Sequence, residues 1–227
     1  MRHSRCLAAT GACLLIVAVP NLFAQGQPAG GSVGATIDRA VTAWSKVKTL
    51  RGTFEQTVTN PLIGSSATAR GQYAQERPNR LAIRFGEPSN DAIVSDGKTV
   101  WIYLPTSAPG QVIKRAATGL GGTPNDLTAQ FLEAPRAKYE ISAAASRTVD
   151  GHAASGLLLV PKPGAGAPFS KATVWVDDDD SLIREFEETE PNGVIRHVRL
   201  TTVEPNVSVD PGLFVFTVPK GVRVVER

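Results

Sequence analysis

The sequence has few of the residues that enzymes use most often as nucleophiles and general bases. Its 227 residues include two cysteines and three histidines, and both cysteines, Cys6 and Cys13, lie close to the N-terminus. We find no Gly-x-Ser-x-Gly elbow, no phosphate-binding loop and no His-Glu-x-x-His pair. His152 lies in a turn-like segment and His197 in an alternating strand pattern, so we expect both on the surface. These absences argue against a hydrolase, and we expect no enzymatic activity, no cofactor and no metal.

Neither sign of charge is strongly in excess. The formal net charge is +3, and no basic stripe is present that would indicate nucleic acid as a partner. One acidic run, Asp177–Asp180, has the spacing of a calcium loop together with Ser181 and Glu188. However, Leu182 stands where such a loop needs glycine for its sharp turn. We therefore expect this run to be a solvated hairpin turn and not a calcium site.

Only one long apolar run is present, from Leu7 to Val19. It follows Arg2 and Arg5 and is typical of a signal peptide over residues 1–24, with cleavage after Ala24 and export to the periplasm. The run is too short for a comfortable membrane span. A faint lipoprotein box ending at Cys13 is the alternative, but most of the apolar run follows that cysteine. Cleavage would remove both cysteines and reduce the formal charge to about +1.

The helical signals are short. Residues 25–35 are rich in Gly, Pro and Ser and are predicted to form a flexible arm. Thr36 can cap a helix that continues to about Leu50, with Trp44 on its apolar stripe. Thr123–Asp126 opens a second, shorter helix, and Pro135 ends it. The apolar side of this second helix contains Leu127 and Phe131.

Strand patterns dominate the rest of residues 36–227, which we expect to form a single domain. Strands are predicted at 50–58, 67–75, 80–85, on both sides of Asp96-Gly97, and at 139–143, 154–160, 172–176, 182–188, 194–203 and 214–218. About eleven strands and two helices predict a mainly β fold. The expected architecture is an open, unclosed antiparallel β-barrel or curved sheet with a few helices on one face.

The stretch from Asp91 to Gln111 contains the strongest hairpin signal. Asp96-Gly97 lies between two apolar runs and predicts a type I′ turn with positive φ at both positions. In the second strand, Val100, Ile102 and Leu104 alternate with Thr99, Trp101 and Tyr103. Both faces are apolar, so both are expected to be covered. Such a pattern fits the lining of a cavity as well as a packed core.

Four blocks of residues make the chain similar to the periplasmic outer-membrane lipoprotein carrier LolA family. They are Leu50–Gln56, Gly71–Tyr73 through Arg77-Pro78, Ile93–Tyr103, and Phe214–Val224, in family order and across nearly the whole exported chain. The third block is the most specific and the Arg-Pro pair is the next. The chain departs from the family at Leu81 and Ile83, where aromatic residues are usual, at Arg80, which replaces a common apolar residue, and at Leu104-Pro105, where an acidic residue is often found.

The resemblance implies an unclosed barrel with a helical lid over an apolar cavity. In this interpretation the cavity binds lipoprotein acyl chains and the protein, a monomer, shuttles them from an inner-membrane lipoprotein-releasing ABC transporter to an outer-membrane acceptor. It also implies that Arg77 latches the closed lid by hydrogen bonds to lid backbone. The expected lining residues are Trp44, Phe54, Leu81, Ile83, Phe85, Trp101, Tyr103, Leu127 and Phe131. The alternative is a LolA-like lipid- or lipoprotein-binding sensor or regulatory domain without transfer activity.

Overall fold

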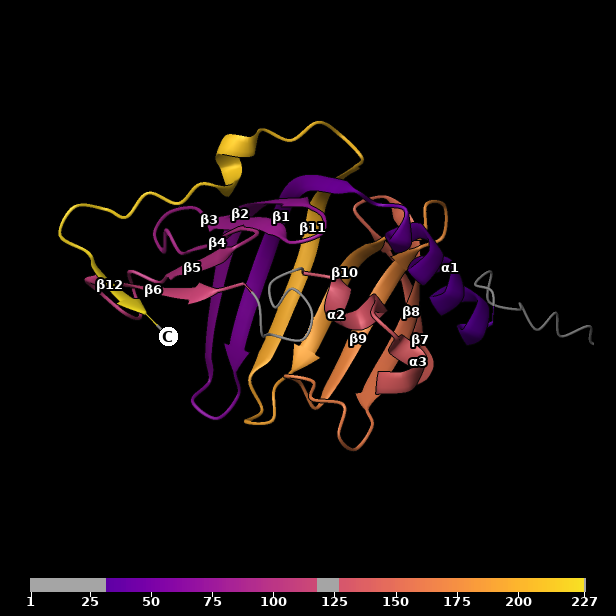
Figure 1. Cartoon of the computed structure of the whole chain (residues 1–227). Helices are drawn as coiled ribbons and strands as arrows, with labels where there is room; N and C mark the ends of the chain where they lie inside the picture. Colours follow the sequence, from indigo (N-terminus) through magenta and orange to yellow (C-terminus); the bar gives the residue numbers. More distant parts are fainter. Residues whose placement is uncertain (1–31, 118–126, 227) are drawn as a thin grey trace, which may run out of the picture.

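A computed structural model describes residues 32–117 and 127–226, and Figure 1 shows their arrangement. Twelve strands form one sheet in the order β12-β6-β5-β4-β3-β2-β1-β11-β10-β9-β8-β7, which does not close into a barrel. All neighbouring pairs are antiparallel except β12 and β6, which are parallel. The predicted open antiparallel architecture is confirmed, but the set of strands differs, because β6 and β12 were not predicted and the strand predicted at 214–218 does not form.

The strand bounds are close to those predicted, although several strands are longer. The strands are β1 (Thr49–Asn60), β2 (Ser65–Glu76), β3 (Arg80–Phe85), β4 (Ala92–Asp96), β5 (Thr99–Tyr103), β6 (Gln111–Ala116), β7 (Tyr139–Val149), β8 (His152–Pro161), β9 (Lys171–Asp177), β10 (Ile183–Thr189), β11 (Ile195–Pro205) and β12 (Arg223–Glu226). The predicted strand at 214–218 is not one: a 3₁₀ helix, η1 (Pro211–Phe214), ends there and an irregular segment follows.

The first helix, α1 (Val33–Ser45), is shifted toward the N-terminus relative to the prediction. Ser32, not Thr36, is its cap: the Ser32 hydroxyl accepts a hydrogen bond from the Ala35 backbone N–H at 3.3 Å. The end of the predicted flexible arm is therefore helical, while residues 1–31, including the predicted signal peptide, lie outside the described residues. The helix ends five residues early because Thr49 already pairs with Glu76 in the sheet.

The second helical region is divided in two. The predicted cap at Thr123–Asp126 lies outside the described residues, and the structure shows α2 (Ala129–Leu132) and α3 (Pro135–Lys138). Pro135 does not end a helix but begins α3, a position where its missing N–H costs nothing. The break comes at Ala134, whose φ of 50° is left-handed. Within the described residues, no helix combines the length and apolar character needed to cross a membrane.

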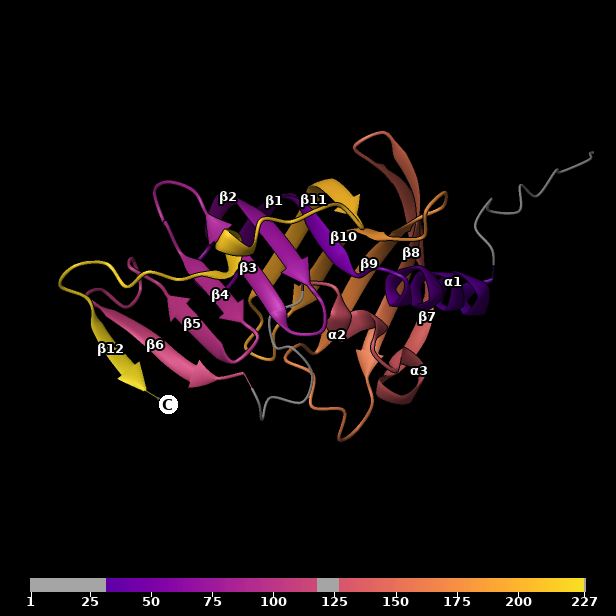
Figure 2. The same ribbon diagram turned by 45° about the horizontal axis from the view of Figure 1, so that its top comes forward.

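The sheet has two differently covered faces. Helices α1 and α2 pack on the face that we call the inner face, where the largest cluster of buried apolar side chains lies. On the opposite, outer face, Phe214 of η1 packs against Ala74 and Ala82, and Figures 1 and 2 both place η1 beside β3. Both faces of the central strands are therefore apolar because the helices cover the inner face and the C-terminal segment around η1 covers the outer face.

Two aromatic rings on the inner face lie over glycines of the neighbouring strand. Tyr73 is paired with Gly52, and Phe54 with Gly71. A Cβ added at Gly52 would be 2.7 Å from the Tyr73 hydroxyl, and one at Gly71 would be 2.6 Å from the Phe54 ring. Phe54 also meets Phe85 edge-to-face, with ring centroids 5.1 Å apart. The blocks around residues 50–56 and 71–73 thus interlock because each supplies the space that the other fills.

The turn after β4 differs from the predicted type I′ turn. Gly97 has a φ of 96°, but Asp96 is extended and pairs with Arg80 of β3. The Asp96 carboxylate accepts hydrogen bonds from the backbone N–H groups of Lys98 and Thr99, both at 2.7 Å. The pairing with β3 holds Asp96 in the strand, so its side chain closes a longer turn that the dipeptide alone did not indicate.

The acidic run after β9 forms a turn, but Asp177 is not solvated as predicted. Its side chain is buried, and one carboxylate oxygen lies 2.8 Å from both Arg184 Nε and His152 Nδ1. Burial would raise the pKa of Asp177, but the Asp179 backbone N–H and the Arg184 guanidinium more than offset this effect and lower the pKa below its usual value. The oxygen that a calcium ion would need is therefore already paired with side chains of the protein.

Candidate functional site

Seven of the nine predicted lining residues meet in the inner-face cluster. Phe54, Leu81, Ile83 and Phe131 are buried in it, and Trp44, Phe85 and Leu127 pack against it while remaining partly exposed. They come from α1, β1, β3 and the α2 region, which together extend from residue 33 to residue 132. Alternation along β3 explains its contribution, because Leu81, Ile83 and Phe85 project to the same side. We call this set the inner-face cluster.

Trp101 and Tyr103 do not belong to this cluster. Val94 pairs with both Ala82 and Trp101, so these three residues share the outer face. There Trp101 and Tyr103 contact the ring of Phe216, with centroid distances of 5.6 and 5.9 Å. The prediction of one shared lining is wrong for these two residues because the C-terminal segment supplies an aromatic cover that strand alternation could not reveal.

The inner-face cluster is closed in this structure. Phe131 of α2 is fully buried, with its ring centroid 5.7 Å from that of Phe169 and 5.0 Å from that of Phe186. Beneath Trp44 and Leu132, a residual pocket has a volume of only about 20 Å³, which is room for about one water and far too little for a lipid chain. A lipid chain can enter this space only if the helices move away from the sheet.

Helix α2 is also tied to the sheet by polar contacts that the sequence analysis missed. The Gln130 side-chain amide donates to the Glu188 carboxylate at 2.6 Å, and the Tyr139 hydroxyl donates to the Gln130 carbonyl at 2.8 Å. Arg196 Nε donates to the other Glu188 oxygen at 2.9 Å. The sequence did contain a signal for this contact: Glu188 lies two residues after the inward-facing Phe186 on β10, so strand alternation places both side chains on the inner face.

Burial dominates the electrostatics of this anchor. It raises the pKa of Glu188, and the Arg196 guanidinium and the Gln130 amide offset only part of the effect. Burial also raises the pKa of the Tyr139 hydroxyl, and the nearby charge of Glu188 adds to the increase. A buried carboxylate that is satisfied partly by a helix side chain becomes less stable when that helix leaves. The contact therefore opposes the opening of α2.

Arg77 contacts the helical layer through an aromatic ring. Its guanidinium carbon lies 3.9 Å from the centroid of the Trp44 ring on α1, and its backbone N–H donates to the Lys48 carbonyl at 2.9 Å. Its Nη2 atom is buried, and the structure gives it no hydrogen-bond partner among residues 32–117 and 127–226. The contact with the helix is thus a cation–π contact and not the expected hydrogen bond to helix backbone.

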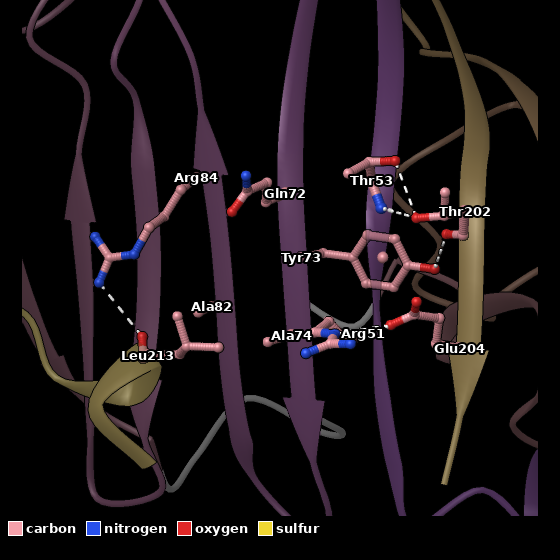
Figure 3. A pocket seen from close by; sticks show the side chains of 11 residues that line it. Arg51, Thr53, Gln72, Tyr73, Ala74, Ala82, Arg84, Thr202, Glu204 and Leu213 are labelled. Carbon is pink, nitrogen blue, oxygen red and sulfur yellow. Dashed lines mark hydrogen bonds and ion pairs between the residues drawn. The ribbon is translucent and has the colours of Figure 1, made fainter. Parts of the chain in front are cut away.

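A second, more polar pocket lies on the outer face and is shown in Figure 3. It has a volume of about 290 Å³ and is lined by side chains that include Arg51, Glu204 and Arg84. Arg51 and Glu204 form an ion pair at 2.7 Å, and Arg84 donates to the Leu213 carbonyl at 3.3 Å. Charged groups that already have partners make this pocket a poor match for an acyl chain, so the inner-face cluster is the better candidate.

Comparison with known proteins places the chain in a family. A model of the outer membrane lipoprotein carrier protein LolA matches residues 45–217. The chain is 26% identical over 221 residues to an outer-membrane lipoprotein carrier protein of Alkalilimnicola ehrlichii, covering 94% of this chain and 91% of that relative. It is 30% identical over 184 residues to one of Salmonella paratyphi B, covering 80% and 83%.

Solved structures agree in fold. The complex of MucA and MucB from Pseudomonas aeruginosa matches with a TM-score of 0.51 at 15% identity, covering 85% of this chain and 63% of that chain. An uncharacterized conserved protein from Thermus thermophilus matches with a TM-score of 0.50 at 14% identity, covering 86% and 98%. Because the family model spans most of the sequence and named relatives align over most of their length, the chain belongs to the LolA family of outer-membrane lipoprotein carrier proteins.

Proposed function

We propose that this chain carries lipoprotein acyl chains through the periplasm in a space that opens between α1, α2 and the inner face of the sheet. The observation that supports this most is the convergence of Trp44, Phe85, Phe131 and the rest of the inner-face cluster under two short helical elements. The exporter would be an inner-membrane lipoprotein-releasing ABC transporter, and the acceptor an outer-membrane protein. The carrier would act as a monomer after removal of its signal peptide.

An apolar space of this kind suits transport without catalysis. Burying a CH₂ group is worth about 0.8 kcal/mol, so a chain of about sixteen carbons represents on the order of 10 kcal/mol that water cannot supply. Apolar burial is non-directional and needs no reacting groups. The inner-face cluster therefore fits a binding role and not an enzymatic one.

The closed packing offers a physical route to release. In this structure, the rings of Phe131, Phe169 and Phe186 already bury one another. Loading would exchange these contacts for contacts with acyl chains, so much of the apolar surface is covered in both states. The net free energy of loading is then a small difference between large terms, which allows uptake from one partner and delivery to the next.

The proposal is tested by a transfer assay with two separately scored steps. Membrane vesicles containing the exporter and a radiolabelled lipoprotein would be incubated with the purified chain, and soluble lipoprotein would be measured. The soluble complex would then be mixed with liposomes carrying the acceptor. We expect both release and delivery. Stable acyl binding without delivery would instead favour the sensor alternative, and the absence of acyl binding would exclude both functions.

Replacing Arg77 with leucine is expected to leave lipoprotein release intact and to slow delivery. Arg77 stacks on Trp44 in the closed arrangement of this structure, so losing this contact favours the loaded state over the closed one. A cation–π contact contributes about 0.5–2 kcal/mol, which corresponds to roughly a two- to thirtyfold shift. Arg77→Lys keeps a cation but loses the planar guanidinium, and should be intermediate.

The matched control is Arg80→Leu. Arg80 is close in sequence, but its side chain is exposed and pairs with Glu76 at 3.2 Å, so this change should leave both steps of transfer near the wild-type rate. Normal delivery by Arg77→Leu in the same assay would show that the contact between Arg77 and Trp44 does not hold the helical layer closed.

A further inference from the structure

The most exposed large apolar side chains lie together at the tip of the β1–β2 hairpin. Leu62 is 81% exposed and Ile63 is 74% exposed, the two highest values among the large hydrophobic residues that the structure describes. They are consecutive in the turn between Asn60 and Ser65. Two adjacent aliphatic side chains that are this exposed form one contiguous apolar patch, and contiguous patches on a protein surface can mark an interaction site.

The hairpin holds this tip in a fixed conformation. β1 and β2 pair up to Asn60 and Ser65, directly below the turn. The Asn60 side chain accepts a hydrogen bond from the Leu62 backbone N–H at 3.1 Å, and Gly64 closes the turn with a φ of 65°. The exposure of Leu62 and Ile63 therefore comes from an ordered turn and not from an unpaired chain.

The tip also projects beyond the neighbouring strand. β2 pairs with β3 only as far as Gly71 and Phe85, so residues 65–70 of β2 have β1 on one side and, in the part of the chain that the structure describes, no strand on the other. Figure 1 shows the hairpin reaching past β3 toward the lower edge of the sheet. A flat surface can approach the tip from this direction without first touching β3.

The hairpin carries no charged side chain near its tip, and Arg196 of β11, which is paired with Val58 of β1, has Glu188 as its ion-pair partner. No Asp, Glu, Lys or Arg occurs from Gln56 to Ala69. The charged residues at the two ends of this stretch, Glu55 and Arg70, pair with each other at 2.9 Å. The side chains in between include hydroxyl pairs such as Thr57 with Thr68 at 2.9 Å. The tip would therefore bind a partner through apolar contacts, and the partner's charge would contribute little to binding.

We propose that Leu62 and Ile63 insert into the surface of a lipid bilayer and bring the protein into contact with a membrane of zwitterionic or neutral lipid. A protein partner fits less well, because a stable protein interface buries about 800 Å² on each side, far more than two side chains offer. A bilayer needs no complementary shape and takes up apolar side chains singly. This membrane contact does not depend on acyl-chain binding by the inner-face cluster.

The proposal is tested with a polarity-sensitive fluorophore on the exported form of the chain, which has no cysteine after Ala24. Ile63→Cys would be labelled with nitrobenzoxadiazole and titrated with phosphatidylcholine vesicles at millimolar lipid, at low and high salt. The control is Val215→Cys, labelled in the same way, because Val215 is 61% exposed but lies in the C-terminal segment. We expect a blue-shifted, brighter signal at position 63, little change at position 215, and no salt dependence.

A second variant measures the contribution of the tip without a label. Leu62→Ser with Ile63→Ser should bind the same vesicles at least about tenfold more weakly in sedimentation, because it removes two large aliphatic side chains from the contact. Both positions are exposed, so the circular dichroism spectrum should not change. No signal at position 63, a signal only with anionic vesicles that salt abolishes, or a signal only when the acceptor protein is added would each overturn the proposal.

Discussion

Replacing Gly52 with alanine is expected to destabilise the protein by about 3 kcal/mol or more and to lower its melting temperature by roughly 10 °C. A Cβ at this position would lie 2.0 Å from the Thr202 carbonyl oxygen and 2.7 Å from the Tyr73 hydroxyl. The Thr202 carbonyl belongs to β11 and accepts a hydrogen bond from that same hydroxyl at 3.1 Å. The carbonyl is backbone of β11, so it cannot move away from the new Cβ without disturbing the pairing of β1 and β11.

Gly86→Ala is the matched control for this measurement. At Gly86 the nearest atom would be 3.7 Å from the new Cβ, an ordinary van der Waals contact, and the stability should stay within about 0.5 kcal/mol of the wild type. Thermal unfolding followed by circular dichroism compares the two variants. If the Gly52→Ala protein were as stable as Gly86→Ala, the close packing of the Tyr73 ring of β2 over Gly52 of β1 would not contribute to stability.

Replacing Leu81 with glutamate is expected to weaken acyl-probe binding at least tenfold. Leu81 is 1% exposed within the inner-face cluster, and a carboxylate there would lose its hydration with no partner, at a cost of several kcal/mol. Binding of a fluorescent fatty-acyl probe provides the measurement. Leu81→Met keeps the apolar surface and nearly the same volume, so it should bind almost as well as the wild type.

A charge at Leu81 can also prevent folding, so a second position keeps this prediction testable. Phe85 lies on the same face of β3 and is only partly buried, which makes Phe85→Asp easier to tolerate. Circular dichroism would establish that each variant is folded before binding is measured. Unchanged probe binding by folded Phe85→Asp and Leu81→Glu would place the acyl site elsewhere.

Much of the sheet could be predicted from the sequence because each strand carries its own signal. Alternation along Arg80–Phe85 correctly placed Leu81, Ile83 and Phe85 on one face, and the turn residues marked most strand ends. The helical regions were less predictable, since long-range pairing competes with local propensity. Thr49 joins the sheet and shortens α1, and Ala134 adopts a left-handed conformation that lets Pro135 start a new helix.

The candidate site was predictable in composition but not in its division between two faces. Alternation shows which residues of β5 share a face, but only the partner elements decide which face is inner. Phe216, more than a hundred residues further along the chain, packs against Trp101 and Tyr103 on the outer face. The polar anchor at Glu188 was missed because an acidic residue on a short strand usually faces solvent.

The central claim is that acyl chains bind between the helices and the inner face of the sheet. Adjacent residues of β3 test it directly, because Phe85 faces the inner cluster while Arg84 lines the outer pocket. Benzoylphenylalanine would be placed at position 85 or at position 84, and each protein would be illuminated in the presence of a lipoprotein with radiolabelled acyl chains. We predict acyl crosslinks from position 85 and none from position 84. Crosslinks from position 84 with none from position 85 would contradict the claim and assign the ligand to the outer pocket.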